Sequence, residues 1–212
     1  MSDASAAWWP WLVIAGLGVY HGVNPAMGWL FAVALGLHRK SRAVVLISLA
    51  PIALGHAAAV AVAIAAFLML GLLIDRTVLT WLAAAVLIAW ALWHAFYGHR
   101  QRVLVGMQTG LVGLLLWSFV MASAHGAGLM IVPALMPLCT SGATPTHALA
   151  DTAMVPALAA LGVHTAAMLA TITVISVAVY SWMGVAFLRR GWINFDLVWI
   201  GALLTSGVVL LV

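Results

Sequence analysis

The chain has 212 residues, of which 67% are hydrophobic and only 6% are charged. Soluble domains carry about a quarter of charged residues, so this composition excludes a soluble globular protein and predicts an integral membrane protein. The formal net charge of +4 comes from a few scattered basic residues rather than from a basic patch, so we expect no nucleic-acid partner.

Six uncharged stretches follow one another along the chain, and most are longer than the ~20 apolar residues that a spanning helix needs. They are residues 4–38, 43–74, 77–99, 103–150, 152–188 and 197–212. We therefore predict an all-α integral membrane protein with six transmembrane helices. The N-terminus has no basic region before its apolar run, so we expect the first helix to be retained rather than cleaved.

The basic residues concentrate in alternate loops of this arrangement. Between spans one and two, three and four, and five and six lie Arg39, Lys40, Arg42, Arg100, Arg102, Arg189 and Arg190. Because lysine and arginine are retained on the cytoplasmic side, these loops are predicted to face the cytoplasm and both termini the outside. We expect the membrane to be the bacterial inner membrane.

Four histidines lie near the middle of four of these spans. His21, His56, His125 and His164 are each more than ten residues from the nearest charged side chain. An ionisable side chain at this depth costs about 2–3 kcal/mol even by the mildest scales, so four of them indicate function rather than packing. Imidazole is a ligand for nickel, cobalt, copper and zinc, so we predict a transition-metal ion at a central site.

The two halves of the chain resemble each other around these histidines. Each half has a His-Gly pair, a methionine a few residues later, and a second histidine near a glycine, 35 and 39 residues after the first. Residues 1–102 and 103–212 are therefore predicted to be two three-helix repeats of one membrane domain. Since three is an odd number of spans, the second repeat is inverted relative to the first, as in many secondary transporters.

Prolines and glycines near the histidines predict broken helices. Pro25 lies four residues after His21 and leaves the carbonyl of His21 without its helical partner. In the second half, Gly126 and Pro133 weaken the helix that carries His125. We expect breaks near Pro25 and Pro133, where non-helical backbone borders a site inside the protein.

Three further side chains are candidate metal ligands. Met121 precedes His125 by four residues and Met168 follows His164 by four, so each methionine shares a helix face with a histidine. The competing interpretation is that both methionines fill the core. Asn24, three residues after His21, is a candidate oxygen ligand.

The sequence His-Gly-x-x-Pro at His21, followed by Gly-His at His56 and joined by short basic loops, resembles the nickel/cobalt permeases. More broadly, it is similar to the LysE-like superfamily of small six-span transporters. The resemblance implies that His21 is a motif ligand and His56 the second-span histidine. Those permeases have Asp-His where this chain has Ala26 and Met27, so a carboxylate and an imidazole are missing and nickel or cobalt is not specifically indicated.

We interpret the chain as a transporter of a transition-metal cation rather than an enzyme. Two other classes remain open. One is an intramembrane metal- or haem-binding protein with a redox or enzymatic role, because paired histidines also bind haem iron. The other is a non-catalytic assembly subunit whose apolar surface meets a membrane partner or a second copy of the chain. We expect the lipid bilayer and the metal ion as partners, and a membrane partner protein or a second copy of the chain remains an open alternative.

Overall fold

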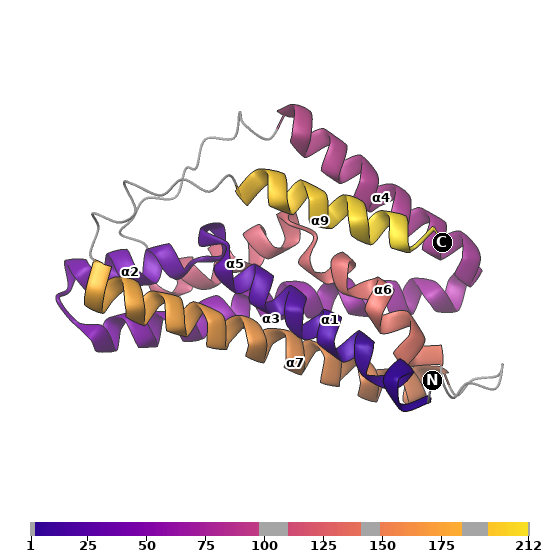
Figure 1. Cartoon of the computed structure of the whole chain (residues 1–212), viewed down its shortest axis with the longest axis horizontal. Helices are drawn as coiled ribbons and strands as arrows, with labels where there is room; N and C mark the ends of the chain where they lie inside the picture. Colours follow the sequence, from indigo (N-terminus) through magenta and orange to yellow (C-terminus); the bar gives the residue numbers. More distant parts are fainter. Residues whose placement is uncertain (1–2, 98–109, 141–148, 184–194, 212) are drawn as a thin grey trace.

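The computed structural model describes residues 3–97, 110–140, 149–183 and 195–211, and the secondary structure within these ranges is helical. The predicted loop residues Arg100, Arg102, Arg189 and Arg190 and the boundary between the two halves lie outside them. Figure 1 shows the arrangement of the helices. They are α1 (Asp3–Val23), η1 (Pro25–Met27), α2 (Trp29–His38), α3 (Arg42–Leu73), α4 (Arg76–Tyr97), α5 (Leu111–Ala124), α6 (Ala127–Thr140), α7 (Leu149–Ala178), η3 (Val179–Met183) and α9 (Phe195–Val209).

Within the described ranges, three helices are long and apolar enough to cross a membrane: α3, α4 and α7. The bent pair α5 and α6 makes a fourth if it is one span. The predicted first span is divided into α1, η1 and α2, and the predicted sixth corresponds to α9, which has 15 residues. The predicted all-α class is confirmed, and these helices are those of a membrane protein.

The first span breaks at Pro25, as predicted. Asn24 ends the helical run in an extended conformation, and its side-chain oxygen accepts a hydrogen bond from the backbone N–H of Ala26 at 3.0 Å. Gly28 then has a φ of +115°, a left-handed conformation that a side chain would disfavour, and α2 begins after it. The asparagine cap and the glycine together redirect the local backbone without leaving the Ala26 N–H unbonded.

The second break lies at His125 and Gly126, not near Pro133. Helices α5 and α6 are bent by 61° at this point, and Gly126 has a φ of +66°. Pro133 instead lies inside α6, which continues past it to Thr140. The expectation of a break near Pro133 is therefore wrong, because the proline removes one N–H donor whereas the left-handed glycine redirects the whole chain.

Tryptophan side chains satisfy backbone carbonyls at both breaks. In each break two indole N–H groups donate to oxygens that the interrupted helix leaves without a regular partner. The pairs are Trp29 to Val23 at 3.2 Å, Trp117 to Ala26 at 3.2 Å, Trp90 to Ala124 at 2.6 Å and Trp199 to His125 at 3.0 Å. These bonds remove most of the penalty of non-helical backbone inside the membrane.

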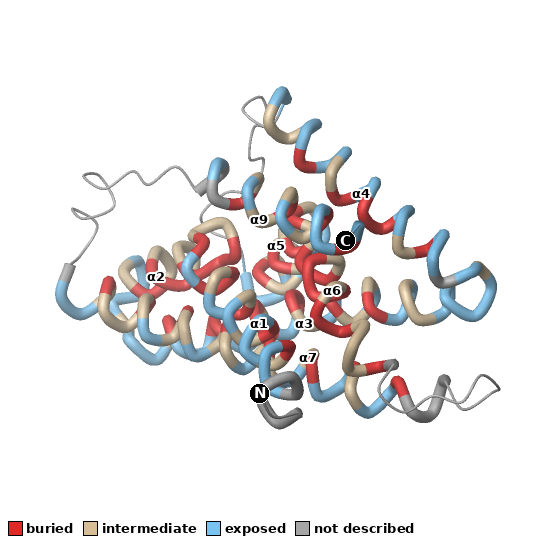
Figure 2. Tube along the Cα trace, turned by 45° about the vertical axis from the view of Figure 1, so that its right-hand side comes forward, coloured by how far each residue is buried: buried red, intermediate tan, exposed pale blue. Residues whose placement is uncertain are grey.

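Two helix pairs form the centre of the molecule, α1 with α7 and α3 with α5. Both pairs meet at glycines: a Cβ atom at Gly18 would collide with the carbonyl oxygen of His164, and one at Gly55 with that of Leu115. Close backbone approach of this kind is the usual way in which membrane helices associate. Figure 2 shows buried residues gathered where these helices face one another, whereas α4 leaves one side exposed and packs against α9.

Candidate histidine site

Three of the four intramembrane histidines come together in this centre. His21 lies in the last turn of α1, and His56 and His164 lie near the middle of α3 and α7. Each of the three side chains has an exposed fraction of 1% or less. They come from positions far apart in the sequence, so their meeting results from the packing of α3 against α7 and of α7 against α1.

The three imidazole rings form a nearly equilateral triangle. The distance between ring centroids is 5.1 Å for His21 and His164, 5.3 Å for His56 and His164, and 5.4 Å for His21 and His56. The rings of His56 and His164 are nearly parallel, with 16° between their planes, whereas the His21 ring is steeply inclined to both. We call these three residues the histidine triangle.

Hydrogen bonds to backbone carbonyls define where the protons lie. The Nδ1 atom of His21 lies 2.7 Å from the carbonyl oxygen of Leu17, and Nδ1 of His164 lies 3.2 Å from that of Ile14. A carbonyl only accepts, so both Nδ1 atoms carry hydrogen, and in the neutral rings Nε2 keeps its lone pair. Because Nε2 of His56 lies 3.1 Å from Nε2 of His164, His56 is the donor in that contact.

Two ring nitrogens in the triangle are buried without a hydrogen-bond partner, Nε2 of His21 and Nδ1 of His56. Given the proton positions above, each has a lone pair to offer. A buried polar atom without a partner costs about 1–3 kcal/mol. The triangle therefore offers lone pairs suited to a cation.

The contacts within the triangle join rings to each other and to the backbone. In the part of the chain that the structure describes, no group of three or more His, Cys, Asp or Glu side chains is already arranged around a common point that could hold a metal ion. The physical reason is the hydrogen bond between His56 and His164, which directs their Nε2 atoms at each other. Binding of one ion by all three rings requires this bond to open.

The fourth histidine, His125, lies in a different environment. It is the cap residue of α5, and its Nδ1 donates to the carbonyl of Met121 at 2.7 Å. Its ring packs against Trp199, with centroids 4.8 Å apart, and His94 packs on the same indole at 4.1 Å. The sequence predicts that the four rings converge in one layer and that any ring standing aside lies next to the site; the structure packs the His125 ring against Trp199 of α9, beside the bend at Gly126.

The other candidate ligands have structural roles here. The oxygen of Asn24 caps η1, and Met168 is fully buried in a core cluster with Leu114 and Ile172. Met121 contributes its backbone carbonyl to His125. Sequence reasoning missed Trp199 as a partner of His125, and its place in an apolar segment of a tryptophan-rich chain is the only sequence signal for it.

Comparison with known proteins leaves the site to be interpreted from its geometry. No protein-family model matches the chain, and no curated protein and no solved structure is significantly similar to it.

Proposed function

We propose that the protein transports a transition-metal cation across the membrane through the histidine triangle. The observation that carries this proposal is the spacing of the three rings, with centroids 5.1 to 5.4 Å apart at a fully buried position. Three imidazoles that bind one ion at ~2.0–2.1 Å with angles between tetrahedral and trigonal have centroids about 5.1–5.5 Å apart. The observed triangle therefore has the size that a single ion requires.

A change of tautomer at His56 and rotation of the rings, rather than movement of the helices, would complete the site. The Nε2 lone pair of His21 is already available, and that of His164 becomes available when its hydrogen bond from His56 opens, since the carbonyls of Leu17 and Ile14 hold the Nδ1 protons. Such carbonyl partners orient metal-binding histidines in many proteins. His56 would move its proton from Nε2 to Nδ1, which has no hydrogen-bond partner. All three rings would then present lone pairs to the cargo ion while remaining neutral.

We also propose that the chain crosses the bacterial inner membrane six times, as two inverted three-helix repeats over residues 1–102 and 103–212, with both termini outside. Support comes from the two breaks. His21 and His125 each precede a left-handed glycine, Gly28 and Gly126, and each donates from Nδ1 to the carbonyl four residues earlier. Broken helices next to a midplane site are the usual arrangement in transporters with inverted repeats.

Metal binding by the purified full chain tests the proposal. The protein in detergent is titrated with Ag(I), Zn(II) and Ni(II), and bound metal is measured by elemental analysis. We expect about one ion per chain, lost in His164→Ala and retained in His38→Ala, since His38 is exposed at the end of α2. A wild-type chain that binds none of these ions would refute the proposal. Uptake of a bound ion into or out of vesicles then tests transport itself.

The alternative functions give different results in the same experiment. A haem protein would show a visible absorption spectrum whose intensity depends on His21 or His164. An assembly subunit would bind neither metal nor haem and would copurify with a membrane partner. The proposal of transport requires metal binding without a haem spectrum.

A further inference from the structure

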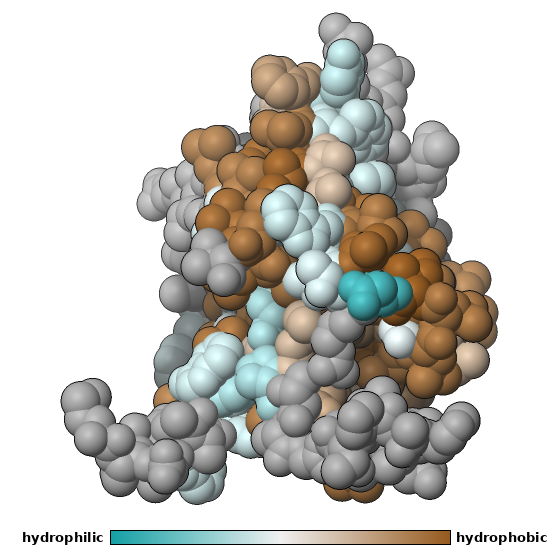
Figure 3. All heavy atoms as spheres, turned by 90° about the vertical axis from the view of Figure 1, so that its right-hand side faces the viewer, coloured by the Kyte–Doolittle hydropathy of each residue, from teal (hydrophilic) through white to brown (hydrophobic). Residues whose placement is uncertain are grey.

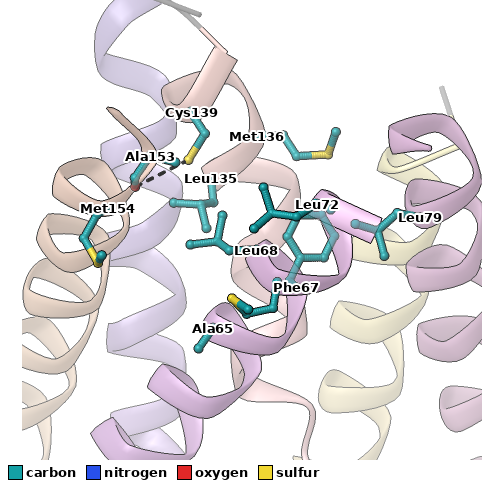
Figure 4. A pocket seen from close by; sticks show the side chains of 12 residues that line it. Ala65, Phe67, Leu68, Leu72, Leu79, Leu135, Met136, Cys139, Ala153 and Met154 are labelled. Carbon is teal, nitrogen blue, oxygen red and sulfur yellow. Dashed lines mark hydrogen bonds between the residues drawn. The ribbon is translucent and has the colours of Figure 1, made fainter. Parts of the chain in front are cut away.

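A pocket lies at one end of the helix bundle. It has a volume of about 260 Å³ and opens between the C-terminal parts of α3 and α6 and the N-terminal parts of α4 and α7. Figure 4 shows leucine, methionine and phenylalanine side chains around it, with Cys139 and Ala153 at one edge. It is separate from the histidine triangle, which lies further along α3 and α7.

The lining of the pocket suits an apolar occupant. None of the described residues that line it is charged. The Cys139 thiol is directed at the carbonyl of Ala153, at 4.0 Å, and the hydroxyl of Thr80 donates to the sulfur of Met136, at 3.9 Å. A cation here would lose its water without gaining a compensating charge, which is strongly unfavourable. The flexible methionine side chains instead adapt well to an irregular apolar molecule.

The depth of the pocket in the bilayer follows from helix geometry. Ala153 lies 11 residues before His164 on α7, and Ala65 lies 9 residues after His56 on α3. At 1.5 Å per residue the pocket begins ~14–17 Å from the histidine triangle. The hydrocarbon core extends about 15 Å to each side of the bilayer centre. With the triangle at the centre, the pocket begins at the edge of the hydrocarbon core, where the acyl chains of one leaflet join the glycerol, and its α3 lining continues outward to Leu72, roughly 24 Å from the triangle.

The pocket is open at its rim, on the outside of the helix bundle. Its rim residues Met69, Leu72 and Met154 each expose more than half of their surface, at 61%, 56% and 53%. Figure 3, which views the molecule from this end, shows hydrophobic side chains over much of the face. A volume of 260 Å³ is below the range of about 300–1,000 Å³ that is typical of small-molecule sites, so it accommodates a chain segment rather than a bulky ligand.

From these observations we infer that the pocket binds the acyl chain of a phospholipid from the adjacent leaflet. The absence of charged residues among the described lining means that the headgroup is not selected. The specificity lies in the apolar chain, which fills the space between α3, α4, α6 and α7 at the membrane boundary.

Photo-crosslinking of the full chain in lipid nanodiscs tests this inference. The probe is a phosphatidylcholine with a diazirine near the glycerol end of one acyl chain, and labelled positions are mapped by mass spectrometry. We expect labelling to concentrate on lining residues such as Met69, Met136 and Met154. Ala65→Trp, which fills the pocket, should lower the labelling there at least several-fold. Ala66→Trp is the matched control, because Ala66 is also exposed on α3 but does not line the pocket.

Two measurements keep the result interpretable if Ala65→Trp folds poorly. Met136→Ala enlarges the pocket and should raise the labelling, and a phosphatidylglycerol probe with the same chain should label the wild type equally. The inference is overturned by labelling spread evenly over the exposed faces of α4 and α9. Equal labelling of the two tryptophan variants, strong dependence on the headgroup, or crosslinks to a second copy of the chain would also overturn it.

Discussion

His21 and His125 make the same local hydrogen bond, from Nδ1 to the carbonyl oxygen four residues earlier, at the same distance of 2.7 Å. In both rings Nδ1 therefore carries the proton, and in the neutral ring Nε2 keeps its lone pair. Their surroundings differ: the His21 ring lies 5.1 Å from His164 and 5.4 Å from His56, whereas the His125 ring packs on Trp199 at 4.8 Å. The same local hydrogen bond therefore occurs in two different environments.

Replacement of these two histidines by alanine should consequently give different results. His21→Ala removes one vertex of the triangle, and we expect the affinity for metal to fall by about 10- to 100-fold or more, as for loss of a residue at a metal site. His125→Ala should lower the affinity much less than His21→Ala, since its ring packs on the indole of Trp199. Isothermal titration with the ion that binds the wild type measures both. Equal losses in the two variants would place His125 in the ion site as well.

The charge of the cargo ion should matter more than its size. The four acidic residues of the chain, Asp3, Asp75, Asp151 and Asp196, lie outside the central segments, and the three rings are neutral ligands. The cost of bringing an ion into a low-dielectric interior grows with the square of its charge, so a divalent ion costs about four times as much as a monovalent one. We expect Ag(I) to bind more tightly than Zn(II) or Ni(II) in competition titrations. Tighter binding of Zn(II) would indicate that an anion enters with the metal.

The glycines at the helix contacts should be sensitive to a single methyl group. Gly18→Ala places a Cβ against the carbonyl of His164, and the resulting displacement of the backbones should cost about 1–3 kcal/mol. Gly16, on the same helix, has open space within 4 Å of the position that a Cβ would take, so Gly16→Ala should be neutral or slightly stabilising. Thermal unfolding in detergent, followed by size-exclusion chromatography, compares the two. A tolerated Gly18→Ala would show that α1 and α7 can move apart.

The indole donors at the breaks should contribute to stability through their N–H groups. Trp117→Phe and Trp199→Phe keep most of the ring but leave the carbonyls of Ala26 and His125 without their donors, at a cost of about 1–3 kcal/mol each. Trp81→Phe is the control, because Trp81 is 60% exposed on α4. The same thermal assay measures all three variants. A stability of Trp117→Phe equal to that of the control would mean that another group takes over the carbonyl.

The proposed orientation can be tested with single cysteines in a Cys139→Ala background. Thr77→Cys lies at the exposed start of α4, which the charge distribution places outside, and Lys40→Cys lies in the exposed turn between α2 and α3, which it places inside. A membrane-impermeant maleimide applied to whole cells should label Thr77→Cys and should reach Lys40→Cys only after permeabilisation. The reverse pattern would invert the topology.

Much of the centre could be predicted from the sequence, because it depends on local properties. A histidine far from any charge in an apolar stretch has a strong reason to be buried and used, and the burial of His21, His56 and His164 follows that rule. The break at Pro25 was predictable for the same reason, since the missing N–H is a property of the residue itself.

The environment of His125 was not predictable in this way. It depends on the left-handed backbone at Gly126 and on the approach of Trp199 from α9, which is a tertiary contact between residues 74 positions apart. The expected break near Pro133 was wrong for a related reason. A proline inside a membrane helix is tolerated when neighbouring helices support it, and the composition around Pro133 carries no information about that support.

The glycine contacts divide the histidine triangle between two closely packed helix pairs, which we call blocks. His21 and His164 belong to the block of α1 and α7, joined at Gly18, and His56 belongs to the block of α3 and α5, joined at Gly55. The site thus lies at the interface between the two blocks, and the hydrogen bond between His56 and His164 crosses this interface. A small slide of one block along the other would separate His56 from its two partners while leaving those two together. An ion bound by all three rings would therefore hold the two blocks together at this interface.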